Sequence, residues 1–154
     1  MTNDLAIELR IRDQIATLEA ALSEEINSGR MNEAELPLKH IFTDGVYARE
    51  MFLPAGTIVL GKIHRHEHLN FISKGSVSVL TKEGLKHLDG PCTMVSPKGV
   101  KRAVLVHTDT IWTTIHANPS NETDLEKIED FTIAKSYDEL APPEEMAQLA
   151  EVTQ

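Results

Sequence analysis

Cysteine is almost absent from this chain, which has one, Cys92, among 154 residues. A single thiol can form no disulfide within the chain, and it offers no zinc-finger spacing. Basic residues are also scarce, because 15 lysines and arginines stand against 24 aspartates and glutamates, for a net charge of −9. Binding to a nucleic-acid polymer generally needs a basic face, so we expect no such partner.

Long apolar runs are missing as well. No segment approaches the roughly 18 consecutive apolar residues that a membrane-spanning helix needs, so the sequence predicts no membrane partner. The stretch MTNDLAIELRIRD is charged from its fourth residue and predicts no signal peptide. We therefore expect a cytoplasmic protein with the length of one domain.

The first segment, residues 1–30, has the periodicity of an amphipathic helix. Apolar side chains recur at steps of three and four, at Ile11, Ile15, Leu18, Leu22 and Ile26. Thr2, Asn3 or Asp4 can cap its start, and Gly29 can end it. This helix could dock on its own domain or pair with a second subunit, and the sequence does not separate the two.

Short strand patterns fill residues 36–118. Segments such as TIVLGKIH, SVSVLT and TIWTTIH are rich in Val, Ile, Leu and Thr, and turn sequences such as PAG, SKG and KEG separate them. This spacing is typical of an antiparallel sandwich or barrel. Residues 119–154 predict a C-terminal extension, with a short helix capped by Thr123, an edge strand in FTIAKS and an acidic tail.

The stretch GKIHRHEHLNFISKG carries the most informative spacing. Gly56 is followed by five residues, then Lys62-Ile63-His64, three residues, His68, six residues and Gly75. These intervals resemble the first motif of the cupin superfamily, in which glycine, His-x-His, glutamate and glycine occupy the same places. Here Lys62 stands at the first histidine position, and His68 stands at the glutamate position.

A second stretch, GPCTMVSPKGVKRAVLV, resembles the second cupin motif. Its first interval, from Gly90, is one residue longer than usual, and Pro97 and Gly99 then fit. Arg102 occupies the histidine position of that motif, and Val106 occupies the asparagine position. The resemblance spans roughly residues 40–117.

The resemblance implies an all-β fold, a cupin-type double-stranded β-helix of the RmlC-like jelly-roll kind. An N-terminal amphipathic helix precedes this barrel, and a short C-terminal helical extension follows it. Residues 45–75 and 108–130 also resemble small cupin-like proteins carried by bacteriophages, a group without a firmly established function. For a phage-encoded chain the expected location is the host cytoplasm. Cupin barrels commonly pair through their strands, so the resemblance also implies a homodimer.

The histidines suggest a metal site of altered composition. A usual cupin site has three imidazoles and one carboxylate, and the cations Lys62 and Arg102 disfavour that four-ligand cage. His116 shares one face of its strand with Trp112. If that face points inward, three histidines (His64, His68 and His116) could hold iron, manganese, nickel or zinc, with Asn70 or water completing the shell.

The same substitutions also suggest a pocket for a small anion. The resemblance places Lys62, His64, His68 and Arg102 inward, and arginine and lysine suit phosphate or carboxylate groups. With Trp112 as an aromatic wall and Asn70 nearby, a phosphorylated or carboxylate ligand would fit. Alternatively, Glu50 or Glu67 could neutralise the cations internally. Arg49 and Glu50 lie on a predicted strand, and one of them is expected to face the pocket.

Three functions are consistent with these residues, and none of them assigns a catalytic residue. The first, which we favour, is a binding protein for a small anionic molecule. The second is a metal-dependent cupin enzyme, dioxygenase- or isomerase-like, that uses a histidine-ligated ion. The third is a structural or assembly protein built through the N-terminal helix and the acidic tail.

Overall fold

The computed structural model describes residues 3–140, so the predicted acidic tail over residues 141–154 and a cap at Thr2 lie outside the described chain. The chain begins with α1 (Asn3–Asn27) and continues through β1 (Leu38–Thr43), β2 (Val46–Leu53), β3 (Ile58–Leu60), β4 (Ile63–His64), β5 (His68–Lys74) and β6 (Ser76–Thr81). It continues with β7 (Gly84–Asp89), β8 (Cys92–Ser96), β9 (Ala103–Val106), β10 (Thr110–Ala117), α2 (Leu125–Thr132), β11 (Ile133–Ala134) and a 3-10 turn, η1 (Tyr137–Leu140). Among these residues no helix is long and apolar enough to cross a membrane.

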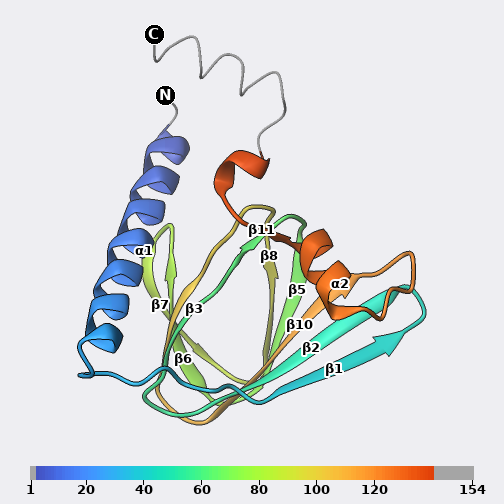
Figure 1. Ribbon diagram of the computed structural model, residues 1–154, viewed down its shortest axis with the longest axis horizontal. Helices are drawn as coiled ribbons and strands as arrows, with labels where there is room; N and C mark the ends of the chain where they lie inside the picture. The colour runs from blue at the N-terminus through green and yellow to red at the C-terminus, as the bar shows by residue number, and fades with distance from the viewer. Residues whose placement is uncertain (1–2, 141–154) are drawn as a thin grey trace, which may run out of the picture.

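Antiparallel sheets make up the body of the protein (Figure 1). A five-stranded sheet has the order β1-β2-β10-β5-β8, a four-stranded sheet has the order β3-β9-β6-β7, and β11 pairs with β4 in a third. The mostly β, antiparallel architecture expected from the strand pattern is confirmed. Within residues 3–140 no ladder joins the two larger sheets, so the expected barrel is not closed by hydrogen bonds.

Alternation along the strands creates the hydrophobic core between the two larger sheets. Each core strand turns every second side chain inward, as the period of a β-strand requires. The buried cluster contains Leu53, Ile72, Val77, Val79, Val104, Val106 and Trp112. On β10 the same alternation buries Thr110, Trp112, Thr114 and His116, so this strand carries polar groups into the interior near its end.

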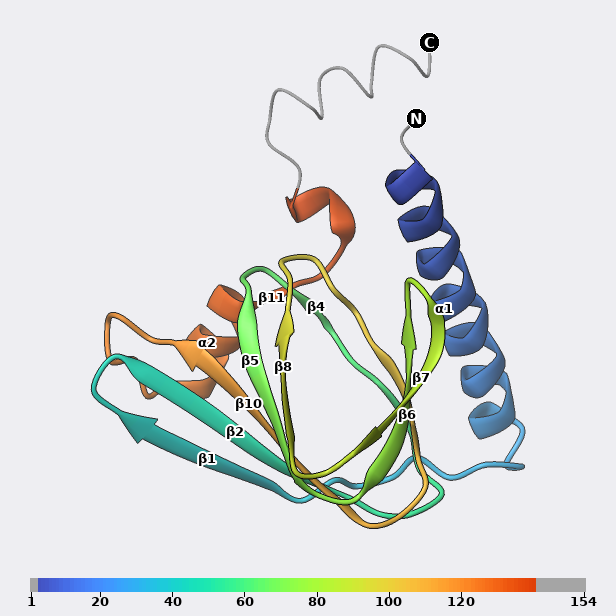
Figure 2. The ribbon, with the colours of Figure 1, turned by 180° about the vertical axis from the view of Figure 1, so that it is seen from behind.

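Helix α1 docks on its own chain, which is one of the two alternatives left open by its sequence (Figure 2). Ile15 is 2% exposed, Lys101 binds Glu19 at 2.8 Å, and the guanidinium of Arg12 lies 3.9 Å from the centre of the Tyr137 ring. Gly29 ends the helix with a φ of 77°, a conformation that glycine adopts without steric penalty. Pairing of this helix with a second subunit stays a prediction.

Helix α2 and β11 return across the end of the molecule at which β4 lies (Figure 1). Ile133 pairs with His64, which fixes α2 beside the histidines. The expected cap at Thr123 is wrong, because the cap is Asp124, whose carboxylate accepts the backbone N–H of Glu126 at 3.0 Å. The expected edge strand in FTIAKS is present as the two residues of β11.

Candidate metal and ligand site

Three histidines from three strands meet inside the protein. His64 ends β4, His68 begins β5, and His116 lies near the end of β10. One ring nitrogen of each lies within 4.8 Å of those of the other two. The ring centres are 4.2 Å apart for His64 and His68, 4.6 Å for His68 and His116, and 5.6 Å for His64 and His116. The arrangement brings all three expected ligands to one point.

The turn between β4 and β5 explains how two of these histidines converge. Residues 65–67 reverse the chain, so His64 and His68 lie on strands that are consecutive in the sequence, β4 and β5, and they face the same interior. His66 lies in the turn, where it is exposed and its ring centre is 4.7 Å from that of Phe131. The resemblance to the first cupin motif implied the inward position of the other two.

Burial keeps these imidazoles neutral. Loss of solvation, with smaller contributions from neighbouring histidines and from Arg49, lowers the pKa of His64 to about 4 and the pKa of His116 to about 3. Burial is also the main cause that lowers the pKa of His68. A neutral imidazole presents a lone pair, which is the form that ligates a metal ion.

A backbone carbonyl orients His68. Its Nδ1 lies 3.2 Å from the carbonyl oxygen of His66. Because a carbonyl only accepts, Nδ1–H must be the donor, and Nε2 is then the nitrogen with a free lone pair. Metal-binding histidines are commonly fixed by such a bond from the second ring nitrogen.

The donor set fits a divalent transition metal. The cluster consists of imidazoles alone, and its three members leave coordination positions for water or a small molecule. Imidazole ligands suit zinc, iron and nickel, whereas manganese generally prefers oxygen ligands. Asn70, the other expected contributor, is engaged in the core: its Oδ1 accepts Trp112 Nε1–H at 2.9 Å and its Nδ2 donates to Ser96 Oγ at 2.7 Å.

Arg102 lies beside the histidines, in what we call the core cavity. This cavity of about 70 Å³ is lined by residues that include His64, His68, Asn70, Arg102 and Trp112. The guanidinium donates to Ser96 Oγ from Nε at 3.1 Å and from Nη2 at 3.0 Å. Burial lowers the pKa of Arg102. Within residues 3–140 no carboxylate forms an ion pair with it.

The side chain of Lys62 lies at the solvent-exposed edge of the site rather than in the interior. Its side chain is 58% exposed, and its ammonium forms an ion pair with Glu129 of α2. The expectation that Glu50 or Glu67 would neutralise Lys62 is therefore wrong. A carboxylate 67 residues further along the chain does so, and no local pattern could have indicated it.

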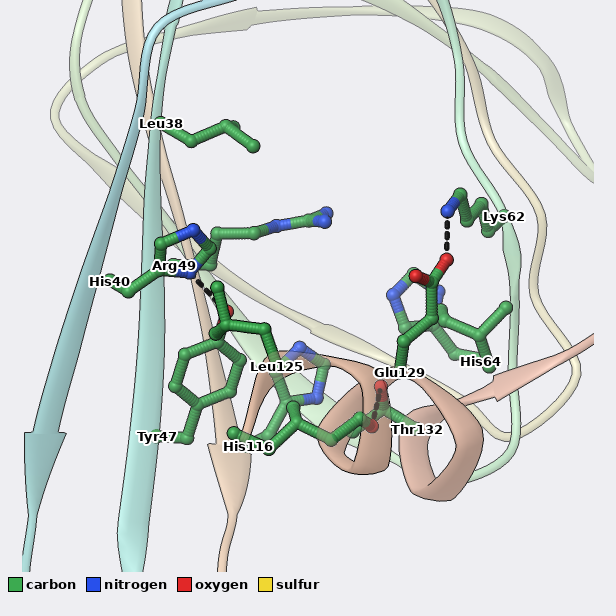
Figure 3. A pocket seen from close by; sticks show the side chains of 12 residues that line it. Leu38, His40, Tyr47, Arg49, Lys62, His64, His116, Leu125, Glu129 and Thr132 are labelled. Carbon is green, nitrogen blue, oxygen red and sulfur yellow. Dashed lines mark hydrogen bonds and ion pairs between the residues drawn. The ribbon is translucent and has the colours of Figure 1, made fainter. Parts of the chain in front are cut away.

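A second cavity of about 280 Å³ lies between α2 and strands β1 and β2, and we call it the α2 cavity (Figure 3). Its lining residues come from six elements and the segment between β3 and β4: Leu38, His40, Tyr47, Arg49, Lys62, His64, His116, Leu125, Ile128, Glu129, Thr132 and Ile133. Three residues, Arg49, Lys62 and His64, line both cavities and so stand between the two spaces.

Arg49, rather than Glu50, faces this interior. The inward positions of β2 are Tyr47, Arg49, Met51 and Leu53, and Glu50 lies on the opposite face of the strand. The sequence left this choice open because two adjacent polar residues give no indication of the face that is buried. Arg49 is thus the additional residue that the structure places beside the histidines.

Comparisons with known proteins give the fold. No family model matches the chain, and no curated protein matches it by sequence. Among solved structures it is similar to KdgF from Halomonas sp., with a TM-score of 0.50 and 14% identity over 62% of this chain and 89% of that one.

Two further structures are similar at lower scores. An RmlC-like cupin family protein with a double-stranded β-helix fold from Methanocaldococcus jannaschii has a TM-score of 0.47 and 15% identity, over 58% of this chain and 86% of that one. An acetylacetone dioxygenase from Acinetobacter johnsonii has a TM-score of 0.48 and 13% identity, over 58% and 68%. The structures that this chain resembles thus include cupin proteins, and the likeness concerns the fold alone.

Proposed function

We propose that this protein binds one divalent transition-metal ion through His64, His68 and His116, and that a small molecule binds next to that ion. The observation that carries the proposal is the convergence of three ring nitrogens within 4.8 Å of one another. Three imidazoles this close together would repel one another if protonated, and their neutrality removes this obstacle to metal binding. Iron, nickel and zinc are the metals that the donor set favours.

The surrounding residues have separate tasks in this proposal. The carbonyl of His66 holds His68 with its Nε2 free, and Asn70 fixes Trp112 and Ser96 as one wall of the core cavity. When bound, the ion would supply Lewis acidity and open coordination positions to a small molecule. A dioxygenase- or isomerase-like enzyme and a non-catalytic binding protein would both use such a centre.

Metal content tests the proposal directly. Protein purified without chelator is loaded with Zn²⁺, Ni²⁺ or, without oxygen, Fe²⁺, and bound metal is measured by mass spectrometry after desalting. We expect one equivalent per chain, lost in His68→Ala and in His116→Ala. His87 is an exposed histidine on β7 of the four-stranded sheet, where it contacts Asp89 of the same strand. The His87→Ala protein should therefore retain the metal. Equal metal content in all four proteins would contradict the proposal.

An anionic ligand in the core cavity is a second proposal, favoured by Arg102. This half-buried guanidinium meets only a serine hydroxyl among residues 3–140, and a buried cation without an anion is energetically costly. Lys62 contributes less than we expected, because Glu129 already balances its charge. Calorimetric titration with inorganic phosphate tests this idea, and unchanged binding in Arg102→Gln would contradict it.

A homodimer is the proposed assembly. It is supported by exposed apolar side chains on the outer face of the five-stranded sheet, where Leu69 is 43%, Phe71 is 37% and Val95 is 53% exposed. Contiguous apolar patches of this kind commonly mark protein contacts. Sedimentation of the full chain tests the proposal, and Phe71→Glu should shift it toward the monomer. For a phage-encoded chain, the dimer would act in the host cytoplasm.

A further inference from the structure

We infer that the α2 cavity binds a small monocarboxylic acid with a short apolar body, and that Arg49 holds the carboxylate. The inference rests on the proposed function in one respect, since the ligand would lie beside the ion held by the histidines. It adds the chemical class of the ligand and the residue that selects it. The binding site for this ligand is the larger α2 cavity, which is distinct from the core cavity beside Arg102.

Arg49 is a cation without a partner inside the described chain. Its Nε is buried and forms no hydrogen bond, and no carboxylate among residues 3–140 forms an ion pair with it. The hydroxyl of Thr114, its neighbour on β10, is likewise buried without a partner, but it lines the core cavity and not the α2 cavity. Leaving the Nε–H of Arg49 unpaired costs free energy that an anionic ligand in the α2 cavity would recover.

The charged side chains around the cavity leave Arg49 as the group that an anion would pair with. Lys62 and Glu129 form an ion pair with each other, whereas Arg49 has no such partner among residues 3–140. A carboxylate accepts two parallel hydrogen bonds from a guanidinium, which makes it a geometric match for this side chain.

The remaining wall of the cavity is apolar. Leu38 from β1 and Leu125 from α2 are 48% and 44% exposed, and Ile128 and Ile133 lie deeper. Figure 3 shows the Arg49 side chain extending from the strands toward the Lys62–Glu129 pair, with Leu38 and Leu125 lining the same space. A ligand with a short hydrocarbon body would cover these exposed leucines while its carboxylate reaches Arg49.

Other polar groups of the cavity are already paired. The hydroxyl of Tyr47 and Nδ1 of His40 lie 2.7 Å apart, and Thr132 Oγ1 donates to the carbonyl of Ile128 at 2.7 Å. These groups have less to gain from a ligand than Arg49 has. At about 280 Å³ the space is at the lower end of the range for small-molecule sites, which again indicates a small ligand.

The test is calorimetric titration with butyrate and with its uncharged counterpart butyramide, on zinc-loaded and on metal-free protein. We expect butyrate to bind, and butyramide to bind at least about tenfold more weakly. Arg49→Gln should weaken butyrate binding by at least about tenfold. Arg49→Lys keeps the charge but loses the planar guanidinium, so its butyrate affinity should lie between those of the wild type and Arg49→Gln. Lys39→Gln removes a cation from the outer face of β1 and should bind as the wild type does.

Two sets of results would overturn the inference. One is equal butyrate affinity in Arg49→Gln and wild type, and the other is tighter binding of butyramide than of butyrate. Metal content is measured on every sample, so the two proposals fail separately. One zinc per chain together with butyrate binding that does not depend on Arg49 overturns the carboxylate site alone. Arg49-dependent butyrate binding in samples that retain no zinc after loading with zinc overturns the metal centre alone.

Discussion

The buried histidines predict a specific loss of stability in acid for the metal-free protein. In the unfolded chain a histidine has a pKa near 6.5, whereas in the folded protein burial lowers the pKa of His64 to about 4 and that of His116 to about 3. Between these values the unfolded chain binds protons that the folded protein excludes. The free energy of unfolding therefore falls as the pH falls through this window, and it is insensitive to these groups above pH 7.

The magnitude follows from the width of the window. Each excluded proton changes the free energy of unfolding by about 1.4 kcal/mol per pH unit. Between pH 7 and pH 5 this amounts to about 2 kcal/mol for each histidine and to about 4 kcal/mol for both. His68, whose pKa is also lowered by burial, acts in the same direction. A loss of this size is a large part of the ~5–15 kcal/mol that stabilises a typical domain.

The assay uses the single tryptophan. Trp112 is 4% exposed and lies in the core, so its fluorescence reports global unfolding in urea. Metal-free wild type and His116→Asn are compared at pH 7, 6 and 5, with His87→Asn as a variant at an exposed site. Between pH 7 and pH 5 the free energy of unfolding should fall by about 2 kcal/mol less in His116→Asn than in the wild type, and in His87→Asn it should fall as it does in the wild type. A wild-type stability that is the same at pH 7 and pH 5 would refute the reasoning.

Substitutions at three further positions, Gly75, Asp124 and Asn70, test the local structure, with Gly84 and Thr123 as comparison positions. Gly75→Ala should cost more than about 3 kcal/mol or prevent folding, because its φ is 107° and a Cβ there would lie 2.6 Å from the backbone of β10. Gly84→Ala, with a φ of 102° and nothing within 4 Å, should cost only the backbone strain of about 1 kcal/mol. Asp124→Ala should cost about 1 kcal/mol in urea unfolding and Thr123→Ala clearly less, whereas equal effects would contradict the assigned cap. Asn70→Ala should cost about 2 kcal/mol or more, since it leaves the buried indole N–H without its acceptor, and a neutral result would show that this bond contributes nothing.

Local pattern was sufficient for the elements and for part of the site. The period of two in the strands and the steps of three and four in residues 3–27 are properties of neighbouring residues, so the sheets and α1 could be predicted. The inward position of His64 and His68 was implied by the resemblance of their motif, and that of His116 depended on which face of its strand points inward. The structure brings the ring nitrogens of all three together, because the pleat of a strand fixes the direction of each side chain once its buried face is known.

Tertiary structure decided the charges. Glu129 pairs with Lys62 because β11 returns along β4, and within residues 3–140 Arg49 remains without a carboxylate because Glu50 lies on the other face of β2. Pairings of this kind join segments far apart in the chain, and no local periodicity encodes them. The sequence by itself determined the alternation that turns every second side chain of a strand to one face, because this depends on neighbouring residues alone. The packing of α2 against the strands decided that Lys62 is balanced by Glu129, whereas neither Arg49 nor Arg102 forms an ion pair among residues 3–140.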